Sequence, residues 1–349
     1  CIRDSFMLVG APGDDPGERF VLKVFAPDVQ REHVEFQRDL LAHALGRAPE
    51  LESLLPRFLG DGDRIARVDF ASQRVDAALL RHVPGRPIAL VEPHAPELLR
   101  EFGATLARLD RALVDFDATP PRAADAEAPS WRLLDGPDEI ARRLDAIASG
   151  PRRELVQRIA GQFDADAVAR IAALRPQVLH QDANEYNVLA RVDPTGAHVS
   201  GLIDFGDAAH GPLVAEPAIA AAYAALGKRD PLAAMGHVVA GYHGELALED
   251  EEFACIFDLA LLRLATSAAI SSERAATNGE VSEYHLVSQA PAWRALAPGT
   301  ARRMGTRSVS PSGSPTRCAT SRSTTRRSRS TSIRFAPARS LSGWCGARR

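Results

Sequence analysis

Short apolar runs bounded by turn-forming residues characterise the first 83 residues. Residues 5–10 ("SFMLVG") and 20–25 ("FVLKVF") flank the polar, Gly/Pro-rich stretch "APGDDPGE", an arrangement typical of two strands joined by a turn. Residues 29–45 instead carry apolar positions such as Val34 and Leu41 at helical spacing. Two more strands are predicted over residues 65–70 and 76–83. The pattern predicts a small sheet-rich region with one helix.

From residue 95 onward the spacing of apolar residues becomes helical. The segment "APELLREFGATLARLDRAL" (95–113) has a Leu/Phe stripe along one face, which is typical of a helix packed on a core. Two short apolar strands, "QVLH" and "HVSGLIDF", flank the polar stretch "HQDANEYN". Further helices are predicted at 215–227, 231–243, 250–274 and 283–296, and two within 136–174, broken near 149–151. This order predicts an α+β fold, with a small antiparallel β region before a larger helical one.

Length and composition are those of an ordinary globular protein. The chain has 349 residues, 45% of them hydrophobic, which is enough to bury a sizeable core in two lobes or domains. Its four cysteines lack metal-type or disulfide-framework spacing, which favours a reducing cytoplasm. No apolar run reaches the length of a membrane-spanning helix, and "CIRDSFMLVG" is not a secretory leader, so no membrane partner is expected.

The net charge of −3 conceals a division within the chain. Residues 301–349 contain twelve arginines and no acidic residue, which leaves 30 basic residues against 45 acidic ones, a charge of −15, in residues 1–300. An acidic globular part argues against nucleic acid as its partner; it suits either cationic small substrates or simply a solubilising surface. The basic Ser/Arg tail cannot bury enough surface to fold. It is either an RNA-binding tail tuned by phosphorylation or, as the abrupt change in composition favours, a disordered segment translated out of frame.

Two polar stretches carry the candidate chemistry, "HQDANEYN" (180–187) and "GLIDFGD" (201–207). Asp182, on a loop between short strands, is suited to act as a general base for an alcohol. Asn187 and Asp204 offer a neutral and a charged oxygen ligand for a hard cation such as Mg²⁺. Phosphoryl transfer needs such a base, such metal ligands and a cation on the nucleotide.

Lys23 is the candidate for that cation. The chain contains only two lysines, Lys23 and Lys228, and Lys23 lies inside the apolar run "FVLKVF". Strand alternation places Leu22 and Val24 on one face and Lys23 on the other. In so arginine-rich a chain, a lysine in an apolar strand indicates a role for a compact ammonium. The alternative is an edge-strand charge that points to solvent.

The stretch "VLHQDANEYNVL" followed by "GLIDFGD" resembles the aminoglycoside phosphotransferase and choline kinase-like superfamily. Its catalytic loop reads H-G-D-x-x-x-x-N, and its metal aspartate lies in an I-D-x-x-D segment. The closer resemblance is to the hydroxylysine kinase-like branch, whose members also occur as N-terminal domains of fusions to class III aminotransferases. Other matching stretches are "VEFQRDLLAHAL", "LLRHVPGRP", "LARLDRAL", "GLIDFGDAAHGPLVAEPAIAAAY" and "GYHGELALEDEEF".

The resemblance implies a protein-kinase-like two-lobe fold. It makes residues 1–83 a nucleotide-binding N-lobe whose first strand is missing upstream, and residues 84–300 a helical C-lobe with the catalytic and metal loops. Residues 301–349 match nothing in the family and form the disordered basic tail.

Roles for single residues follow from the same resemblance. Asp182 becomes the catalytic base or hydroxyl-orienting residue, Asn187 and Asp204 the Mg²⁺ ligands, and Lys23 the contact to the α- and β-phosphates of ATP. His180 is expected to brace the catalytic loop by hydrogen-bonding backbone near the metal aspartate.

The resemblance also assigns the rest of the nucleotide site. Glu35 is the expected partner of Lys23, with Glu32 as a weaker candidate. His82 and Val83 resemble the hinge whose backbone contacts adenine, and Ser5 resembles the end of the nucleotide loop.

Three positions depart from the family pattern or remain open. Gln181 stands where the family has glycine, which adds bulk at a tight turn. Glu216 stands where an aspartate supports the catalytic loop. Asp207 is either a second metal ligand or, the preferred interpretation, a hydrogen-bonded turn residue.

These observations predict a Mg-ATP-dependent kinase that phosphorylates a hydroxyl of a small amine-bearing molecule. A hydroxylysine-like amino acid is the first choice of acceptor, before amino alcohols such as ethanolamine or choline and then aminoglycosides, and a fused aminotransferase domain is an implied partner. One alternative is a non-catalytic nucleotide-binding or regulatory domain of a larger fused enzyme. Another is a metal-dependent phosphoesterase that uses His180, Asp182, Asp204 and His210.

Overall fold

The computed structural model describes residues 2–9, 19–60, 65–119, 129–278 and 292–296. The chain divides into two units, Cys1–Thr306 and Arg307–Arg349, and every described residue belongs to the first. The predicted turn at 11–18, most of the helix predicted at 283–296 and the tail lie outside the described residues.

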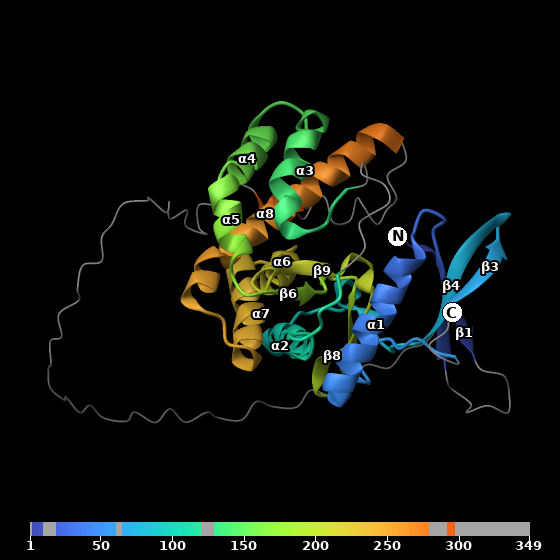
Figure 1. Cartoon of the computed structure of the whole chain (residues 1–349). Helices are drawn as coiled ribbons and strands as arrows, with labels where there is room; N and C mark the ends of the chain where they lie inside the picture. Colours follow the sequence, from blue (N-terminus) through green and yellow to red (C-terminus); the bar gives the residue numbers. More distant parts are fainter. Residues whose placement is uncertain (1, 10–18, 61–64, 120–128, 279–291, 297–349) are drawn as a thin grey trace, which may run out of the picture. The chain divides into compact units, whose positions relative to one another are not determined.

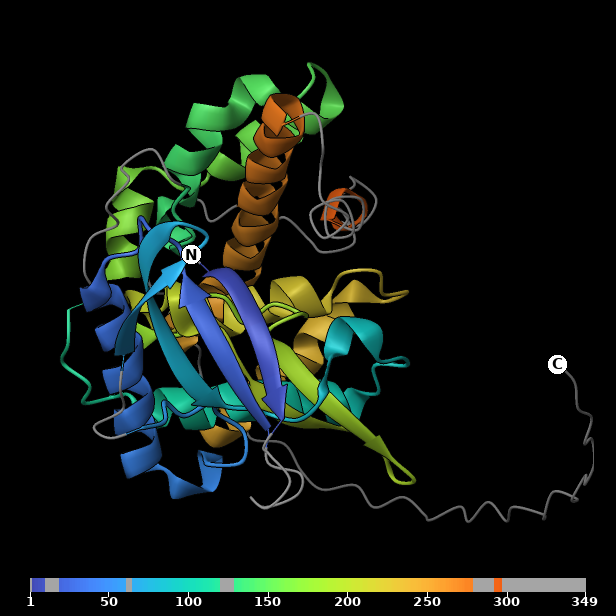
Figure 2. The ribbon, with the colours of Figure 1, turned by 90° about the vertical axis from the view of Figure 1, so that its right-hand side faces the viewer.

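A four-stranded antiparallel sheet forms from the first part of the chain (Figures 1 and 2). The strands are β1 (Ile2–Val9), β2 (Arg19–Phe25), β3 (Ile65–Phe70) and β4 (Gln73–Arg81), in the order β1-β2-β4-β3. In β2, Lys23 pairs with Ser5 of β1 and Ala78 of β4. Leu22 and Val24 pack with Val75 and Ala77 on one face of the sheet, which confirms the predicted alternation around Lys23.

Helix α1 (Arg31–Arg47) contacts both helix α2 (Pro96–Ala112) and the short 3₁₀ turn η5 (Phe205–Asp207). Its buried side chains, including Val34 and Leu40, belong to one hydrophobic cluster that runs from Phe25 of the sheet into the helical part of the molecule. Because this cluster is continuous, the sheet and the helices that carry the polar loops share a core.

The helical part is built around α2, which packs against α7, while α6 packs against α7 and α8 (Figure 1). Its helices are α3 (Gly136–Arg143), α4 (Pro151–Ala160), α5 (Ala165–Ala172), α6 (Ala215–Ala224), α7 (Pro231–Glu245) and α8 (Asp250–Asn278). The segment 136–174 thus forms three helices instead of the predicted two, because Gly161 ends α4 and Asp164 caps α5 by accepting from the Ala167 amide.

Two small sheets hold the polar loops. Strand β6 (Pro176–Leu179) pairs with β9 (Ala209–Pro212), and β7 (Val188–Asp193) pairs with β5 (Arg86–Pro87) and β8 (Gly196–Leu202). The sequence pattern predicted β6 and β8 but missed β7 and β9, whose starts are obscured by the polar stretches that precede them. Together with the helices, these small antiparallel sheets confirm the predicted α+β class.

Helix α8 corrects the expectation about apolar runs. Among the described residues, Asp250–Thr277 is a helix long and apolar enough to cross a membrane by length and composition, although Asp258 and Arg263 interrupt the run. In this structure 72% of its apolar window is buried against the rest of the protein, as expected for a core helix.

The α2–α7 contact depends on glycines that let two backbones approach. A Cβ at Gly241 would lie 1.9 Å from the Arg100 carbonyl oxygen, a backbone atom that cannot rotate away. Replacing Gly241 by alanine is therefore expected to lower the free energy of unfolding by about 2–3 kcal/mol, measured by urea denaturation. Gly244→Ala on the same helix is the matched control, because its Cβ would meet nothing within 4 Å. It should be neutral or slightly stabilising, and equal losses in both variants would contradict this account.

Candidate active site

The two polar stretches lie next to each other because their flanking strands pair. "HQDANEYN" joins β6 to β7, and Asp204 lies between β8 and η5. A backbone hydrogen bond of 2.9 Å from the Ile203 amide to the Asn187 carbonyl links the two loops directly. The strand pairing thus brings Asp182, Asn187 and Asp204 to one region, although 22 residues separate the first from the last.

The Asp182 side chain accepts three hydrogen bonds. Its Oδ2 accepts from Asn184 Nδ2 at 2.9 Å and from Asn187 Nδ2 at 2.8 Å, and its Oδ1 accepts from Arg263 at 2.7 Å. Burial raises the pKa of the Asp182 carboxyl to about 7, against the lowering effect of the Arg263 charge; Asp207 raises it further. A fixed carboxylate whose pKa lies near neutrality matches the needs of a general base.

Asn187 has an orientation that its neighbours dictate. Its Nδ2 donates to both the backbone carbonyl and the Oδ2 of Asp182, at 2.9 and 2.8 Å. Both partners are acceptors, so the nitrogen must face Asp182 and the side-chain oxygen must face away. That oxygen is the atom a hard cation would use.

Arg263, in α8, is a residue of the site that sequence reasoning missed. Its guanidinium is 1% exposed and donates to Asp182 Oδ1, to the Tyr223 hydroxyl at 3.1 Å and to the Trp131 carbonyl at 2.6 Å. It also lies over the Trp131 and Tyr223 rings, 4.9 and 5.5 Å from their centroids. The available signal was an arginine inside the apolar run "LALLRLA" of this helix, because buried arginines are almost always paired.

His180 fixes the backbone on both sides of the site. Its Nδ1 accepts from the Asp182 amide at 3.2 Å, so its Nε2 carries the proton and donates to the Ile203 carbonyl at 3.0 Å. Burial lowers the pKa of His180 to about 4, so the ring is neutral at pH 7. The bond to Ile203, next to Asp204, matches the expected bracing; a role of His180 in catalysis stays a prediction.

Lys23 and Asp204 meet across the molecule, 181 residues apart. The Lys23 Nζ donates to Asp204 Oδ1 at 3.2 Å. Burial raises the pKa of Asp204, but the charge and hydrogen bond of Lys23 outweigh it and lower the pKa overall. Asp204 has a φ of +63°, in the left-handed region. His33 of α1 contacts the carbonyl of nearby Gly206 at 3.0 Å and ties this turn to the helix.

The expected Glu35–Lys23 pair does not form in this structure. Glu35 accepts from Arg31, four residues earlier on the same helix, at 3.0 Å. Arg31 also donates to Asp76 of β4 at 3.1 Å. A partner one helical turn away competes for Glu35, while Asp204 takes the Lys23 ammonium.

The two departures from the family pattern lie in contact with each other. Gln181 has a φ of +64°, a conformation in which glycine carries no steric penalty. The backbone amide of Gln181 donates to Oε2 of the fully buried Glu216 at 3.0 Å. The glutamate therefore contacts the catalytic loop at the position where an aspartate was expected. Burial raises the pKa of Glu216 to about 7.

The remaining predicted residues lie around the sheet and η5. The His82 amide donates to the Arg19 carbonyl at 3.0 Å, and the neighbouring Val83 is buried. Ser5 lies on β1 opposite Lys23. Asp207 ends η5, where burial and the Asp204 charge raise its pKa. Their contacts to a nucleotide or metal stay predictions.

The donor set suits a cation that keeps water and phosphate ligands. Among the described residues, no group of three His, Cys, Asp or Glu side chains could enclose a metal. One carboxylate and one amide oxygen, from Asp204 and Asn187, fit Mg²⁺, which typically takes few protein ligands and completes its shell with substrate phosphates and water.

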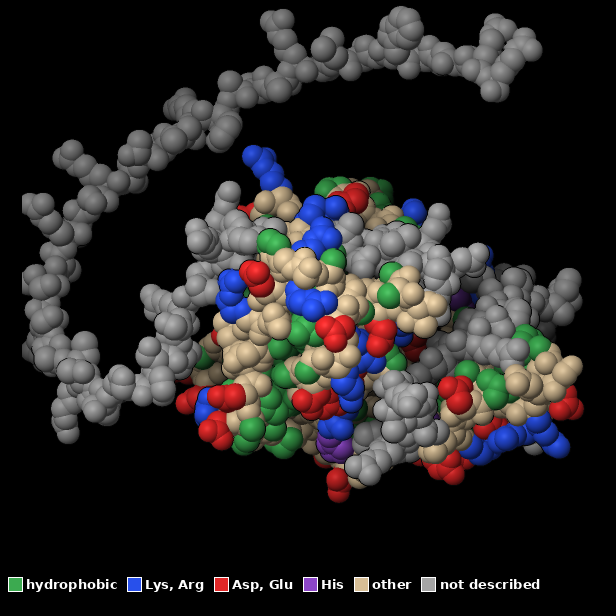
Figure 3. All heavy atoms as spheres, turned by 90° about the horizontal axis from the view of Figure 1, so that it is seen from above, with side chains coloured by type: hydrophobic (Ala, Val, Ile, Leu, Met, Phe, Trp, Pro, Cys, Tyr) green, Lys and Arg blue, Asp and Glu red, His purple; other side chains and the backbone are tan. Residues whose placement is uncertain are grey.

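Charge on the molecular surface is mixed where it can be seen. On the face shown in Figure 3, acidic side chains are interspersed with basic ones and do not form a single acidic patch. Such a mixture of both signs on that face is typical of a solubilising surface.

Comparison with known proteins gives concordant results. The family model described as "Phosphotransferase enzyme family" matches residues 9–253. A hydroxylysine kinase from Mus musculus is 28% identical over 223 residues, which cover 62% of this chain and 59% of the relative. The chain therefore spans less than two thirds of that relative's length.

Solved structures share the fold at low sequence identity. An amicoumacin kinase in complex with AMP-PNP and Ca²⁺ superposes with a TM-score of 0.59 at 14% identity, over 84% of both chains. A microcompartment-associated aminopropanol kinase superposes with a TM-score of 0.52 at 18% identity, over 84% of this chain and 90% of that one.

Proposed function

Since this chain belongs to the phosphotransferase enzyme family, we propose that it is a small-molecule kinase that transfers the γ-phosphoryl group of ATP to an alcohol. The observation that carries the proposal is the convergence of Asp182, Asn187, Asp204 and Lys23, from three distant segments of the chain. A base, two oxygen ligands and an ammonium are the groups that phosphoryl transfer needs.

The nucleotide is held between the sheet and the polar loops. Lys23 exchanges part of its contact with Asp204 for the α- and β-phosphates. The backbone amide of His82 already donates to the Arg19 carbonyl. Adenine therefore contacts the backbone carbonyl of His82 and the backbone amide of Val83. A bound Mg²⁺, held by Asn187 and Asp204, would gather the phosphates and neutralise their charge.

Asp182 accepts the proton of the acceptor hydroxyl. Its two oxygens already receive three hydrogen bonds, which fix the carboxylate plane and leave one acceptor position for the substrate. The side chain is 18% exposed, so a small alcohol can approach it.

The acceptor class follows from the relatives. The curated relatives are hydroxylysine kinases, and one structural neighbour is an aminopropanol kinase. We therefore place a hydroxylated amino acid first and amino alcohols second. A cytoplasmic location, where ATP is available, stays a prediction. A fused aminotransferase domain, implied by the resemblance alone, stays a prediction.

The decisive experiment measures ADP formation with and without an acceptor. With Mg-ATP, turnover is expected in the presence of 5-hydroxylysine or 1-amino-2-propanol, and it should stop when EDTA removes the metal. The competing hypothesis, a non-catalytic nucleotide-binding domain, predicts thermal stabilisation by ATP without turnover for any alcohol in the screen. Phosphate release from esters without ATP would instead support the phosphoesterase.

A further inference from the structure

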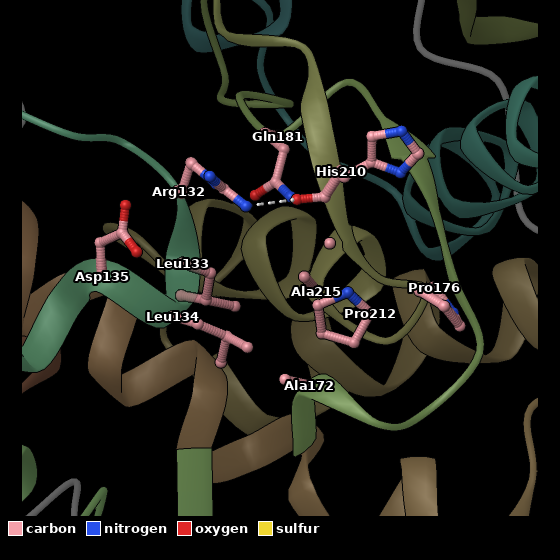
Figure 4. A pocket seen from close by; sticks show the side chains of 11 residues that line it. Arg132, Leu133, Leu134, Asp135, Ala172, Pro176, Gln181, His210, Pro212 and Ala215 are labelled. Carbon is pink, nitrogen blue, oxygen red and sulfur yellow. Dashed lines mark hydrogen bonds between the residues drawn. The ribbon is translucent and has the colours of Figure 1, made fainter. Parts of the chain in front are cut away.

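A pocket of about 190 Å³ lies beside the catalytic loop (Figure 4). An apolar floor is formed by Leu133, Leu134, Pro212 and Ala215. The polar lining comes from Arg132, Asp135, Gln181 and His210. Ala172 and Pro176, at its edge, are exposed, so the pocket is open to solvent. A cavity of about 150 Å³ holds benzene, so this one has room for a small organic molecule.

Gln181 gives the pocket its unusual feature. The side chain is only 1% exposed, and its Oε1 is buried without a hydrogen-bond partner among the described residues. A buried oxygen left without a donor is destabilising, because it has lost its bonds to water. The fold retains this unpaired oxygen together with the left-handed backbone of Gln181.

Gly211, on β9, lies against the side-chain amide of Gln181. A Cβ on Gly211 would lie 2.3 Å from Gln181 Nε2, so a larger residue there would displace the glutamine side chain from its present position. Strain and an unpaired polar atom that persist together indicate a function rather than a packing accident. A hydrogen-bond donor supplied by a ligand would satisfy Oε1.

The charged groups define the rest of the ligand. Arg132 uses one of its five N–H donors on the His210 carbonyl, at 3.1 Å. Asp135 accepts from the Ser130 hydroxyl at 2.6 Å through one of its two oxygens. Among the described residues, both groups have bonding capacity left, and a guanidinium and a carboxylate in one lining are complementary to a molecule that carries both charges.

We propose that this pocket binds a small zwitterion with an aliphatic body, such as an α-amino acid. The ammonium donates to Gln181 Oε1 and faces Asp135, the carboxylate faces Arg132, and the aliphatic chain covers the leucines. Because Asp182 is not among the residues that line it, the site is distinct from the proposed base.

Such a ligand would be coupled to the active site through two segments. Gln181 directly precedes Asp182, and Arg132 directly follows Trp131, whose carbonyl accepts from the Arg263 that holds Asp182. The bound zwitterion is either the phosphoryl acceptor itself or a separate amino acid that acts as an effector.

Isothermal titration calorimetry with L-norleucine tests the proposal on the full chain. Norleucine has no hydroxyl and cannot be phosphorylated, so the measurement does not depend on the proposed kinase activity. Binding is expected in the wild type, about tenfold weaker in Arg132→Gln and in Gln181→Leu, each of which loses one charged hydrogen bond. Hexylamine and hexanoate, which each lack one charge, should also bind about tenfold more weakly.

Two neighbouring alanines provide the matched pair of variants. Ala172→Phe fills the pocket and should abolish binding, whereas Ala173→Phe, at the next exposed position but outside the lining, should not change it. Undetectable binding at millimolar norleucine, or binding that survives Ala172→Phe, would overturn the proposal. If binding is seen, competition with a phosphorylatable acceptor separates the two sources: mutual exclusion identifies the acceptor, and simultaneous binding identifies an effector.

Discussion

Replacing Asp182 by asparagine is expected to reduce phosphoryl transfer by about 10²–10⁴-fold, the usual contribution of a general base. The substitution keeps the shape of the side chain but removes the atom that accepts the proton. In the wild type, Arg263 donates to one oxygen of Asp182, and Asn184 and Asn187 donate to the other. The N–H₂ group of the new asparagine must therefore face at least one of these donors. The rate of ADP formation with 5-hydroxylysine as acceptor is the measurement.

The control separates loss of chemistry from loss of fold. Thermal stabilisation by AMP-PNP should survive in Asp182→Asn, because Lys23 and the His82–Val83 segment are untouched. Asp166→Asn, which changes an exposed aspartate in the first turn of α5, should retain wild-type turnover. Activity of Asp182→Asn within tenfold of the wild type would exclude Asp182 as the base.

The pairing of Lys23 with Asp204 shows how far sequence patterns reach in this protein. Alternation in "FVLKVF" correctly placed Lys23 on the face opposite Leu22 and Val24. The turn-bounded apolar runs located the four strands of the first sheet to within a few residues. Those features depend on local spacing, which the sequence displays directly.

Partner choice inside the site was less predictable. Glu35 was expected to pair with Lys23, but Arg31 lies one turn away on the same helix and takes it. The competition depends on which side chain is nearer in three dimensions, and no period in the sequence encodes that. Likewise, the glutamine at 181 was read as added bulk, whereas its left-handed backbone and its fit against Gly211 emerge only from the structure.

Arg263 is the instructive omission. The chain has many arginines, and the sequence analysis predicted a helix at 250–274 without giving Arg263 a role. Its partners, Asp182, Tyr223 and Trp131, come from three separate segments. Only tertiary structure brings them together, although a charge in an apolar helix did signal that a partner exists.

Replacing Arg263 by alanine is accordingly expected to reduce the turnover number by about 10²-fold, because small displacements of a reacting group can have effects of that size. The guanidinium is one of three donors that orient the Asp182 carboxylate, and it binds the oxygen that neither asparagine contacts. The KM for ATP should remain near the wild-type value, since Arg263 makes no contact with Lys23 or the hinge among the bonds of the described residues.

Chemical rescue then tests whether position alone is responsible. The alanine variant leaves a guanidinium-sized space next to the Trp131 and Tyr223 rings. Added ethylguanidinium should restore part of the lost turnover, whereas ethylammonium, which lacks the planar fork, should restore less.

Because removal of one partner of a buried ion pair destabilises the fold by about 3–5 kcal/mol, Arg263→Lys serves as the folded comparison. It keeps the charge and should lose less activity than Arg263→Ala. A uniform rise in the KM for ATP, or loss of activity that neither lysine nor ethylguanidinium relieves, would instead mean that Arg263 only holds the helices together.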